Sequence, residues 1–195
     1  MKVLCIIPAR YASTRLPGKP LRDIAGKPMI VRVYERAVRA KLVQDVVVAT
    51  DDERICAAVG EYGGRAVMTR TDHATGTDRL AEVAEKMQDY DLIINVQGDE
   101  PLIDSAVIDA LVEPFLADEQ LPMATAKTLL TDEEEIANPN NVKVITDHSG
   151  NALYFSRARI PYARNPGAKV YKHIGIYAYR RDFLLDYARM SQTPL

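Results

Sequence analysis

The sequence has no tryptophan and only two cysteines, Cys5 and Cys56. They lie far apart and form no CxxC pair, Cys5 within an apolar run and Cys56 within a segment of helical pattern. We therefore expect two small buried side chains and no disulfide framework. Such sparse cysteine use is typical of proteins from a reducing compartment, so we expect a cytoplasmic protein.

A surplus of positive charge is also missing. The chain has 25 lysines and arginines against 27 aspartates and glutamates, which gives a net charge of −2. General electrostatic binding of nucleic acid or of an anionic membrane needs a clear basic surplus, so neither partner is expected. Basic side chains can still cluster locally, so the net charge does not exclude binding of a small anionic ligand.

Long hydrophobic runs are absent too. No stretch of the sequence reaches the roughly 18 apolar residues of a membrane-spanning helix. The apolar start, residues 3–7, is too short for a secretory signal, and Pro8, Arg10 and Arg15 follow it at once. This segment therefore predicts a first β-strand.

Short apolar runs alternate with amphipathic segments along the first part of the chain. The apolar runs are residues 3–7, 46–49, 66–68 and 92–96, and the helical patterns are residues 29–40, 52–62, 77–87 and 105–116. The first helical pattern has one apolar face, made of Ile30, Val33, Tyr34, Ala37 and Val38. Runs that are apolar throughout suit inner strands of a parallel sheet covered by helices. The expected fold class is α/β, with a Rossmann-like, mostly parallel sheet flanked by helices.

The pattern changes after about residue 121. Strands are predicted at residues 123–128, 142–146, 152–156 and 174–179, and helices at residues 132–137 and 181–190. These strands either add antiparallel strands to the sheet in the C-terminal half or form a subdomain over its ligand-binding edge. No linker is long enough to separate two domains, so we expect a single domain over residues 1–195.

A basic loop, ARYASTRLPGKP, follows the first predicted strand. In an open α/β sheet, ligands bind at the carboxyl ends of the strands. The loop carries three cations suited to a triphosphate: Arg10, Arg15 and Lys19. Ser13 lies among them, and Gly18 lets the backbone approach a ligand. The loop matches neither GxxxxGK[ST] nor GxGxxG. A solvated basic loop is the alternative, and the position directly after a buried strand favours phosphate binding.

Two carboxylates, Asp99 and Glu100, follow the apolar run LIINV. Carboxylate oxygens are ligands of Mg²⁺, which commonly shares its coordination shell with substrate phosphates and water. Pro101 favours an extended conformation at Glu100, so the two acids need not point the same way. We predict Asp99 as a magnesium ligand. The alternative is an acidic turn that leads into the next helix.

Two predicted helix starts allow more than one interpretation. Asp51, Asp52 and Glu53 precede a helix, where capping of free N–H groups is favoured over metal binding. Gly76 and Arg79 open the next helix, whose backbone N–H groups could bind an anion or a base edge. Arg79 would suit a substrate carboxylate, and an arginine on a solvated surface is the alternative.

The last predicted strand carries aromatic side chains. Strand alternation places His173, Gly175, Tyr177 and Tyr179 on one face. A histidine and two tyrosines form a hydroxyl-rich surface that suits a sugar. Aromatic residues on one face of a strand are equally often part of the hydrophobic core, and both interpretations stay open.

Together these segments resemble one family, the 3-deoxy-manno-octulosonate (Kdo) cytidylyltransferases, also called CMP-Kdo synthetases. The matching segments run in family order over essentially the whole chain: IIPARYASTRLPGKPL, GKPMI, VVVATDD, MTRTDHATGTDRL, NVQGDEPLI, NNVKV, ALYFSRARIPY and KHIGIYAYRR. The resemblance implies a magnesium-dependent nucleotidyltransferase that converts CTP and Kdo to CMP-Kdo and pyrophosphate, for lipopolysaccharide or capsule biosynthesis. It also suggests a homodimer.

The resemblance implies three groups of site residues. Nucleotide-binding residues would be Arg10, Ser13, Arg15, Lys19, Arg70 and Gly76, with the segment around residues 70–76 near the cytosine. Residues around the sugar and its carboxylate would be Arg79, Gln97, Arg157, His173 and Tyr177. Asp99 would bind Mg²⁺, while Arg15 and Lys19 would neutralise charge that develops in the reaction.

The resemblance also implies a difference at the end of the chain. Family members continue past a segment like SQTPL into a further helix, a strand and a motif whose aspartate helps to bind metal. We therefore interpret the chain as one nucleotidyltransferase domain that is truncated at its C-terminus, and expect reduced stability and weak or absent turnover. Two alternatives stay open: a cytidylyltransferase for another acidic sugar, such as sialic acid or an amino-substituted Kdo, and a nucleotide-binding module without turnover.

Overall fold

The computed structural model describes residues 1–12, 16–165 and 167–191 of the chain. By its internal contacts the chain divides into two compact units. The first unit comprises Met1–Ala124 and Ile176–Leu195, and the second comprises Thr125–Gly175. The prediction of one nucleotidyltransferase domain over residues 1–195 stays a prediction. Within the described residues, no helix is both long enough and apolar enough to cross a bilayer.

Four parallel strands form the centre of the first unit. They are hydrogen-bonded in the order β5 (Ala66–Met68), β4 (Asp45–Thr50), β1 (Val3–Ala9) and β6 (Leu92–Asn95). The end of β10 (Val170–Arg180) adds an antiparallel strand beside β6. The inner strands β1 and β6 are buried on both faces, which explains their continuous apolar sequences.

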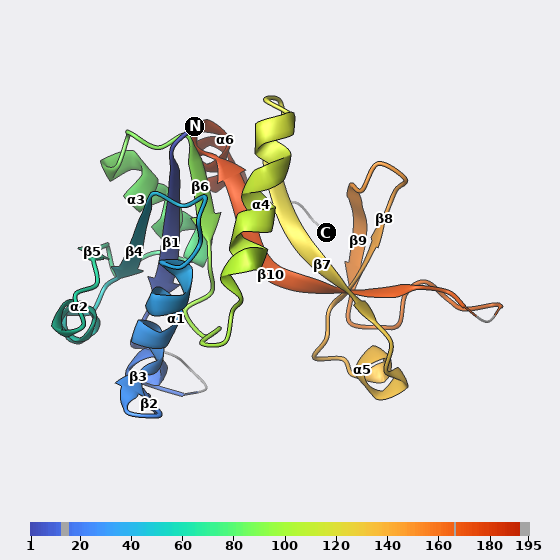
Figure 1. Cartoon of the computed structure of the whole chain (residues 1–195), viewed down its shortest axis with the longest axis horizontal. Helices are drawn as coiled ribbons and strands as arrows, with labels where there is room; N and C mark the ends of the chain where they lie inside the picture. Colours follow the sequence, from blue (N-terminus) through green and yellow to red (C-terminus); the bar gives the residue numbers. More distant parts are fainter. Residues whose placement is uncertain (13–15, 166, 192–195) are drawn as a thin grey trace. The chain divides into compact units, whose positions relative to one another are not determined.

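Helices cover both faces of these strands (Figure 1). One face packs against α3 (Gly76–Lys86) and α6 (Arg181–Ala188), where Leu80 and Leu184 meet Leu4 and Ile6 of β1 in one buried cluster. On the other side lie α1 (Met29–Ala37) and α4 (Ser105–Ala117), which contact each other. Beside β4 and β5 lies α2 (Glu53–Glu61). The carboxyl ends of the parallel strands therefore share one edge.

The second unit is smaller and antiparallel. Its strand β8 (Lys143–Thr146) pairs with β9 (Ala152–Ser156) and with the beginning of β10, and β7 (Met123–Leu130) also pairs with β10. A short helix, α5 (Glu133–Ala137), completes it. The unit has a small apolar cluster of Leu130, Ile136 and Val170.

Lys143 is fully buried in this second unit. Its Nζ donates hydrogen bonds to the carbonyl oxygens of Asn138, Asn141 and Arg157 at 3.0, 2.8 and 2.7 Å. Burial lowers the pKa of the amine, and Arg157 adds to this effect. The lysine thus joins three backbone segments, and each of its carbonyl partners gives the buried amine a hydrogen-bond acceptor.

Three short elements connect the basic loop to α1: the 3₁₀ helix η1 (Lys19–Leu21) and the two-residue strands β2 (Asp23–Ile24) and β3 (Lys27–Pro28). Gly18 has φ 68°, in the left-handed region, and its N–H donates to the carbonyl oxygen of Tyr11 at 2.9 Å. A glycine is favoured there because side chains with a Cβ rarely adopt this conformation.

The predicted α/β fold, with antiparallel strands in the C-terminal half, is confirmed. The apolar-face prediction for α1 is wrong at Val38, which is 53% exposed. Val38 is the C-cap residue of α1, and although its N–H still donates to the carbonyl oxygen of Tyr34, its side chain is exposed at the end of the helix. The last strand also begins earlier than predicted, at Val170.

The expectation of buried cysteines is confirmed for Cys5 and only partly for Cys56. Cys5 lies in β1, and complete burial raises the pKa of its thiol to about 12. Cys56 is half-buried in α2, with its Sγ 3.3 Å from the Sδ of Met68.

Candidate active site

Two adjoining pockets lie at the edge of the first unit where β1 and β6 end. The Arg10 pocket has a volume of about 380 Å³ and is lined by Pro8, Ala9, Arg10, His73, Ala74, Thr75, Gly76, Arg79 and Gln97. The tyrosine pocket has a volume of about 280 Å³ and is lined by Pro8, Gly76, Thr77, Asn95, Gln97, Met123, Tyr177, Tyr179 and Tyr187. The shared residues Pro8, Gly76 and Gln97 make them one continuous candidate site.

The loop after β6 passes very close to the end of β1 at Gly98. A Cβ at this position would lie 2.7 Å from the carbonyl oxygen of Pro8 and 3.4 Å from the Cδ1 of Ile30. The absence of a side chain lets the loop approach β1, which positions Gln97 on the pocket wall and Asp99 beside the basic loop.

An ion pair joins the basic loop to the loop after β6. The Nζ of Lys19 lies 2.6 Å from the Oδ2 of Asp99, although the two residues are 80 positions apart. Their side chains are 38% and 50% exposed, so both remain accessible to a ligand. The predicted phosphate-binding lysine and the predicted metal-binding carboxylate therefore lie side by side.

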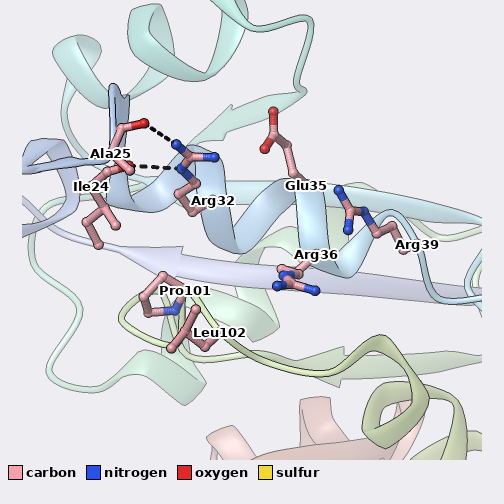
Figure 2. Close-up of a pocket in the computed structure, with 8 residues that line it drawn as sticks. All are labelled: Ile24, Ala25, Arg32, Glu35, Arg36, Arg39, Pro101 and Leu102. Atoms are coloured by element: carbon pink, nitrogen blue, oxygen red, sulfur yellow. Dashed lines mark hydrogen bonds between the residues drawn. The ribbon is translucent and has the colours of Figure 1, made fainter.

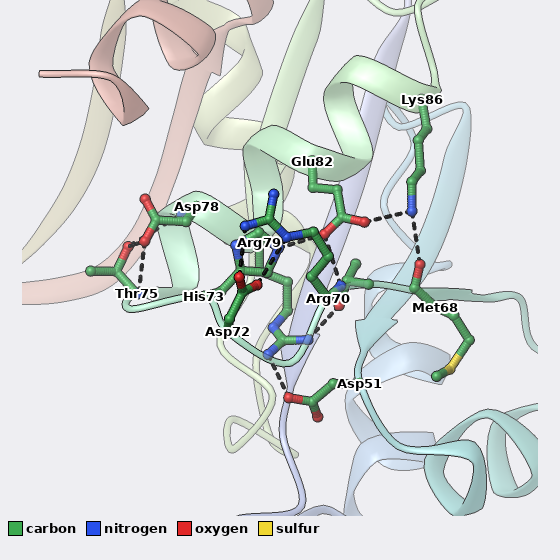
Figure 3. Close-up of polar contacts among 11 residues, drawn as sticks. Asp51, Met68, Arg70, Asp72, His73, Thr75, Asp78, Arg79, Glu82 and Lys86 are labelled. Atoms are coloured by element: carbon green, nitrogen blue, oxygen red, sulfur yellow. Dashed lines mark hydrogen bonds and ion pairs between the residues drawn. The ribbon is translucent and has the colours of Figure 1, made fainter.

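The loop at residues 70–75 is held by Glu82 of α3 (Figure 3). The carboxylate of Glu82 accepts hydrogen bonds from the backbone N–H of Arg70 and the amine of Lys86, and it contacts the Nε2 of His73. Burial would raise the pKa of Glu82, but these contacts outweigh it and lower the pKa to about 2. Glu82 thus positions His73, which lines the Arg10 pocket.

Arg79 stands in the wall of the Arg10 pocket and is only 4% exposed. Its Nη2 pairs with the Oδ2 of Asp51 at 2.8 Å, and its Nη1 donates to the Oγ1 of Thr69 (Figure 3). Arg79 therefore connects α3 to the ends of two neighbouring strands. A direct contact with a substrate carboxylate stays a prediction.

The N-terminus of α3 faces both pockets through Gly76. Thr75 caps the helix by accepting from the N–H of Asp78 at 3.2 Å, and Asp78 accepts from the N–H of Thr75 at 2.8 Å. This reciprocal capping box fixes the start of the helix beside the pocket. The predicted capping role of Asp52 at α2 is confirmed, since it accepts from the N–H of Arg54. Asp51 instead pairs with Arg79.

The tyrosine pocket combines aromatic walls with a buried amide. Tyr177 stacks on Tyr179 with ring centroids 6.0 Å apart, and Tyr179 stacks on Tyr187 at 6.4 Å. Burial raises the pKa of both Tyr177 and Tyr179. Asn95 is 5% exposed, and its Oδ1 has no hydrogen-bond partner among the described residues. A buried acceptor without a partner in a pocket wall suits a ligand hydroxyl.

Several sequence predictions meet at these pockets. Arg10, Gly76, Arg79 and Gln97 line the Arg10 pocket, and Tyr177 lines the tyrosine pocket. The side chain of Arg70 lines neither pocket and pairs with Asp72 at 2.9 Å on the exposed side of its loop. Because only the backbone N–H of Arg70 joins the Glu82 network, a nucleotide contact by its side chain stays a prediction.

Four further predicted residues line neither pocket or lie outside the described residues. Ser13 and Arg15 lie outside the described residues. Arg157 and His173 belong to the second unit. There, Arg157 donates to the carbonyl oxygen of Pro139 at 2.8 Å, and the Nε2 of His173 lies 2.9 Å from the Oγ1 of Thr125. Burial lowers the pKa of His173. Their predicted roles at the sugar stay predictions.

Sequence reasoning missed three site residues. The predicted ligands do not include Asn95, Glu82 or Tyr187. Asn95 and Tyr187 line the tyrosine pocket, and Glu82 holds the loop that forms a wall of the Arg10 pocket. Asn95 alone carried a signal, since it is a polar residue inside the buried run LIINV. The other two are recognisable only from tertiary contacts.

The donor groups around Asp99 bear on the predicted metal. Among the described residues, no group of three or more histidine, cysteine, aspartate or glutamate side chains is arranged to hold a metal ion. Asp99 offers a single half-exposed carboxylate. One or two carboxylates are what Mg²⁺ commonly takes from a protein when substrate phosphates supply further oxygens.

Known proteins match the chain over its whole length. The family model described as cytidylyltransferase matches residues 4–195. The 3-deoxy-manno-octulosonate cytidylyltransferase of Geobacter metallireducens is 53% identical, covering 100% of this chain and 81% of the relative. The protein of the same name from Fusobacterium nucleatum subsp. nucleatum is 55% identical, covering 100% and 80%.

A solved structure agrees with these relatives. The structure of CMP:2-keto-3-deoxy-manno-octonic acid synthetase complexed with CTP has a TM-score of 0.94 and 50% sequence identity, and covers 100% of this chain and 80% of that one. The sequence motifs, the pocket at the strand ends and these matches agree. The chain therefore belongs to the cytidylyltransferase family and, within it, to the 3-deoxy-manno-octulosonate cytidylyltransferases.

Proposed function

We propose that the chain transfers the cytidylyl group of CTP to Kdo, forming CMP-Kdo and releasing pyrophosphate. The observation that carries the proposal is the full-length match to a synthetase solved with CTP, at a TM-score of 0.94. Curated relatives named for this activity are 53% and 55% identical over 100% of the chain. The product would serve lipopolysaccharide or capsule biosynthesis.

The two adjoining pockets suit the two substrates. In the proposal, the nucleotide occupies the Arg10 pocket, where Gly76 opens the N-terminus of α3 and the loop at residues 70–75 forms a wall. The sugar occupies the tyrosine pocket, where Gln97, Tyr177 and Asn95 provide polar groups for its hydroxyls; the Oδ1 of Asn95 has no partner within the described part of the chain. The sugar-binding roles expected for Arg79, which lines the Arg10 pocket, and for Arg157 and His173 of the second unit stay predictions.

The single carboxylate of Asp99 is the kind and number of protein ligand that Mg²⁺ commonly takes beside substrate phosphates. The carboxylate of Asp99 accepts from Lys19, and once this pair opens it would hold a cation together with phosphate oxygens. When bound, Mg²⁺ neutralises phosphate charge and polarises the reacting phosphoryl group. Asp99 is therefore the proposed metal ligand. Lys19, together with Arg10, Ser13 and Arg15, is proposed to bind the phosphates.

The chemistry needs positioning more than it needs a protein nucleophile. The anomeric hydroxyl of Kdo attacks the α-phosphorus of CTP in line, and pyrophosphate leaves. The pockets share Pro8, Gly76 and Gln97, so ligands in both would meet at these residues. Holding the two reactants in this geometry supplies much of the catalysis, and the cations Lys19 and Arg15 stabilise the developing charge.

A pyrophosphate-release assay with CTP, Kdo and Mg²⁺ tests the function. We expect turnover by the unaltered chain, and a loss of about 100-fold or more in kcat/KM for Asp99→Asn and Lys19→Ala. A matched control is Lys169→Ala, an exposed lysine of the second unit. Calorimetric titration with CTP and Mg²⁺ shows whether either change removes metal-dependent binding. If neither does, the site assignment is wrong.

Two comparisons distinguish the competing functions. A panel of sialic acid and amino-substituted Kdo identifies the sugar, since preferential turnover of either would replace Kdo as the substrate. CTP binding with magnesium but without pyrophosphate release would favour a nucleotide-binding module. The homodimer and the cytoplasmic location are further proposals, which light scattering of the purified chain and fractionation of the source cells would test.

A further inference from the structure

A third pocket, called here the arginine pocket, lies apart from the candidate active site. It has a volume of about 260 Å³ and shares no lining residue with the Arg10 pocket or the tyrosine pocket. One wall is charged, with Arg32 and Arg36 of α1 and Arg39 of the turn that follows the helix. The opposite wall is apolar, with Pro101 and Leu102 from the loop after β6 (Figure 2).

Among the described residues, the three arginines of this wall have no acidic partner. Arg32 and Arg36 are four positions apart and therefore lie on the same side of α1. Arg39 lies in the turn after the helix and lines the same pocket. Within the described part of the chain, no carboxylate forms an ion pair with any of these three guanidinium groups. Glu35, which also lines the pocket, is paired with Lys27.

One of the arginines is fixed in place while the other two remain available. Arg32 donates from Nε to the carbonyl oxygen of Ile24 at 3.0 Å and from Nη2 to the carbonyl oxygen of Ala25 (Figure 2). Arg36 and Arg39 make no such contacts with the described residues. Their planar guanidinium groups suit bidentate binding of a phosphate.

The apolar wall indicates that the ligand is more than a bare anion. Leu102 lies opposite the three arginines, and 81% of it is exposed. A buried apolar group on a ligand would cover this leucine and remove it from water. The limited volume admits a small molecule. Because Asp99 lies in the same loop, such a ligand would contact the segment that carries a proposed site residue.

We propose that the arginine pocket binds a small phosphate monoester, with the phosphate on Arg36 and Arg39 and an apolar substituent against Leu102. This proposal does not depend on the reaction proposed for the neighbouring site. Arg36 also lies in the last turn of α1, and Arg39 lies just beyond it, where cations complement the helix dipole. A purely helix-stabilising role predicts lower thermal stability of the variants without a change in ligand binding, and the experiment separates the two.

Calorimetric titration of the 195-residue chain with phenyl phosphate tests the proposal, with inorganic phosphate as a second probe. We expect saturable binding of one phenyl phosphate that persists in Lys19→Ala. The double variant R36A/R39A should bind at least about tenfold more weakly, since two charge-assisted hydrogen-bonding groups are lost. Leu102→Ser should weaken phenyl phosphate more than inorganic phosphate.

The controls match charge and folding. The double variant R164A/K169A removes two exposed cations of the second unit and should bind as the unaltered chain does. If R36A/R39A does not fold, the double variant R36K/R39K keeps the charges but loses the planar forks, and should still bind more weakly. Unchanged affinity in a folded arginine variant would overturn the proposal.

Two further outcomes would also overturn it. Loss of phenyl phosphate binding in Lys19→Ala would place the ligand in the candidate active site. Sedimentation with phosphatidylglycerol vesicles that depends on Arg36 and Arg39, without binding of phenyl phosphate, would assign this surface to a membrane instead.

Discussion

At the scale of single residues, Gly98 determines how closely the loop after β6 can approach β1. In Gly98→Ala, the new methyl group would lie 2.7 Å from the carbonyl oxygen of Pro8. This oxygen belongs to the backbone of β1, which cannot move aside as easily as a flexible side chain. We expect a loss of about 1–3 kcal/mol in unfolding free energy and a larger loss in turnover, because Gln97 and Asp99 flank the site of strain. Urea unfolding and pyrophosphate release measure the two effects.

Gly60→Ala is the matched control for this change. Gly60 lies inside α2, and a Cβ there has nothing within 4 Å. Alanine in a helix interior is more stable than glycine by about 0.5–1 kcal/mol, so this variant should be slightly stabilised and fully active. Equal behaviour of the two alanine variants would contradict the role given to Gly98.

The lowered pKa of Glu82 predicts that the unfolding free energy depends on pH. Its pKa is about 2 in the folded protein against 4.5 as its ordinary value, so the folded state favours the charged form. The stabilisation is present above pH 4.5 and is lost as the pH falls toward 2. We expect Glu82→Gln to lower the unfolding free energy at pH 7 by about 1–3 kcal/mol and to flatten its decline between pH 4.5 and 2.

Denaturant unfolding at several pH values checks this, with Asp72→Asn as the control. Hydrogen bonding to Arg70 also lowers the pKa of Asp72, but Asp72 is exposed, and solvent screens its pairing. Its replacement should leave the pH profile nearly unchanged. Parallel profiles for the Glu82 variant and the unaltered chain would show that Glu82 does not hold the loop as described.

Residue identities predicted part of the site and missed the rest for a physical reason. Lys19 and Asp99 could be paired from the sequence because the carboxyl ends of neighbouring parallel strands share one edge. The contacts of Arg79 with Asp51, and of Glu82 with His73, depend on how helix α3 packs beside the strands. Those contacts leave no periodic signal in the sequence.

At the scale of elements, the capping box of α3 connects helix stability to the pocket. Thr75→Ala removes the hydroxyl that accepts from the N–H of Asp78, at an expected cost of about 1 kcal/mol. The same change should raise the KM for CTP, since the helix start lines the Arg10 pocket. Thr75→Ser keeps the hydroxyl and should restore both values, which thermal unfolding and steady-state kinetics would measure. An alanine variant with unaltered stability would argue against the cap.

Most elements could be predicted because their apolar periodicity is strong. The buried strands and the amphipathic helices of the first unit agree with the predicted ranges to within a few residues. The strands β2 and β3 were missed because two residues are too few to show an alternation. The end of α1 was misplaced because apolar residues continue past Ala37 without the helix continuing.

At the scale of the whole molecule, the division into two units predicts that damage to one unit need not spread to the other. Lys143→Ala would leave the carbonyl oxygens of Asn138, Asn141 and Arg157 without their shared donor. Because these hydrogen bonds are partly buried, we expect a loss of about 1–3 kcal/mol from the second unit. Hydrogen exchange should then quicken over residues 125–175 and stay slow in β1 and β6.

Lys172→Ala, in the same unit on β10, provides a comparison at a lysine that is not fully buried. It should leave the exchange pattern close to that of the unaltered chain. Faster exchange across both units in the Lys143 variant would mean that the chain unfolds as one cooperative body.

The ion pair between Lys19 and Asp99 has a consequence for the order of events at the proposed site. A phosphate bound at Lys19 and a cation bound at Asp99 each compete with the same 2.6 Å contact. Whichever ligand arrives first must break this contact, and the second finds its side chain already released. Only the first binding event therefore includes the free-energy cost of breaking the pair. As a result, each ligand raises the affinity for the other by the same factor. In the absence of either, the pair holds both side chains in a mutually neutralised state.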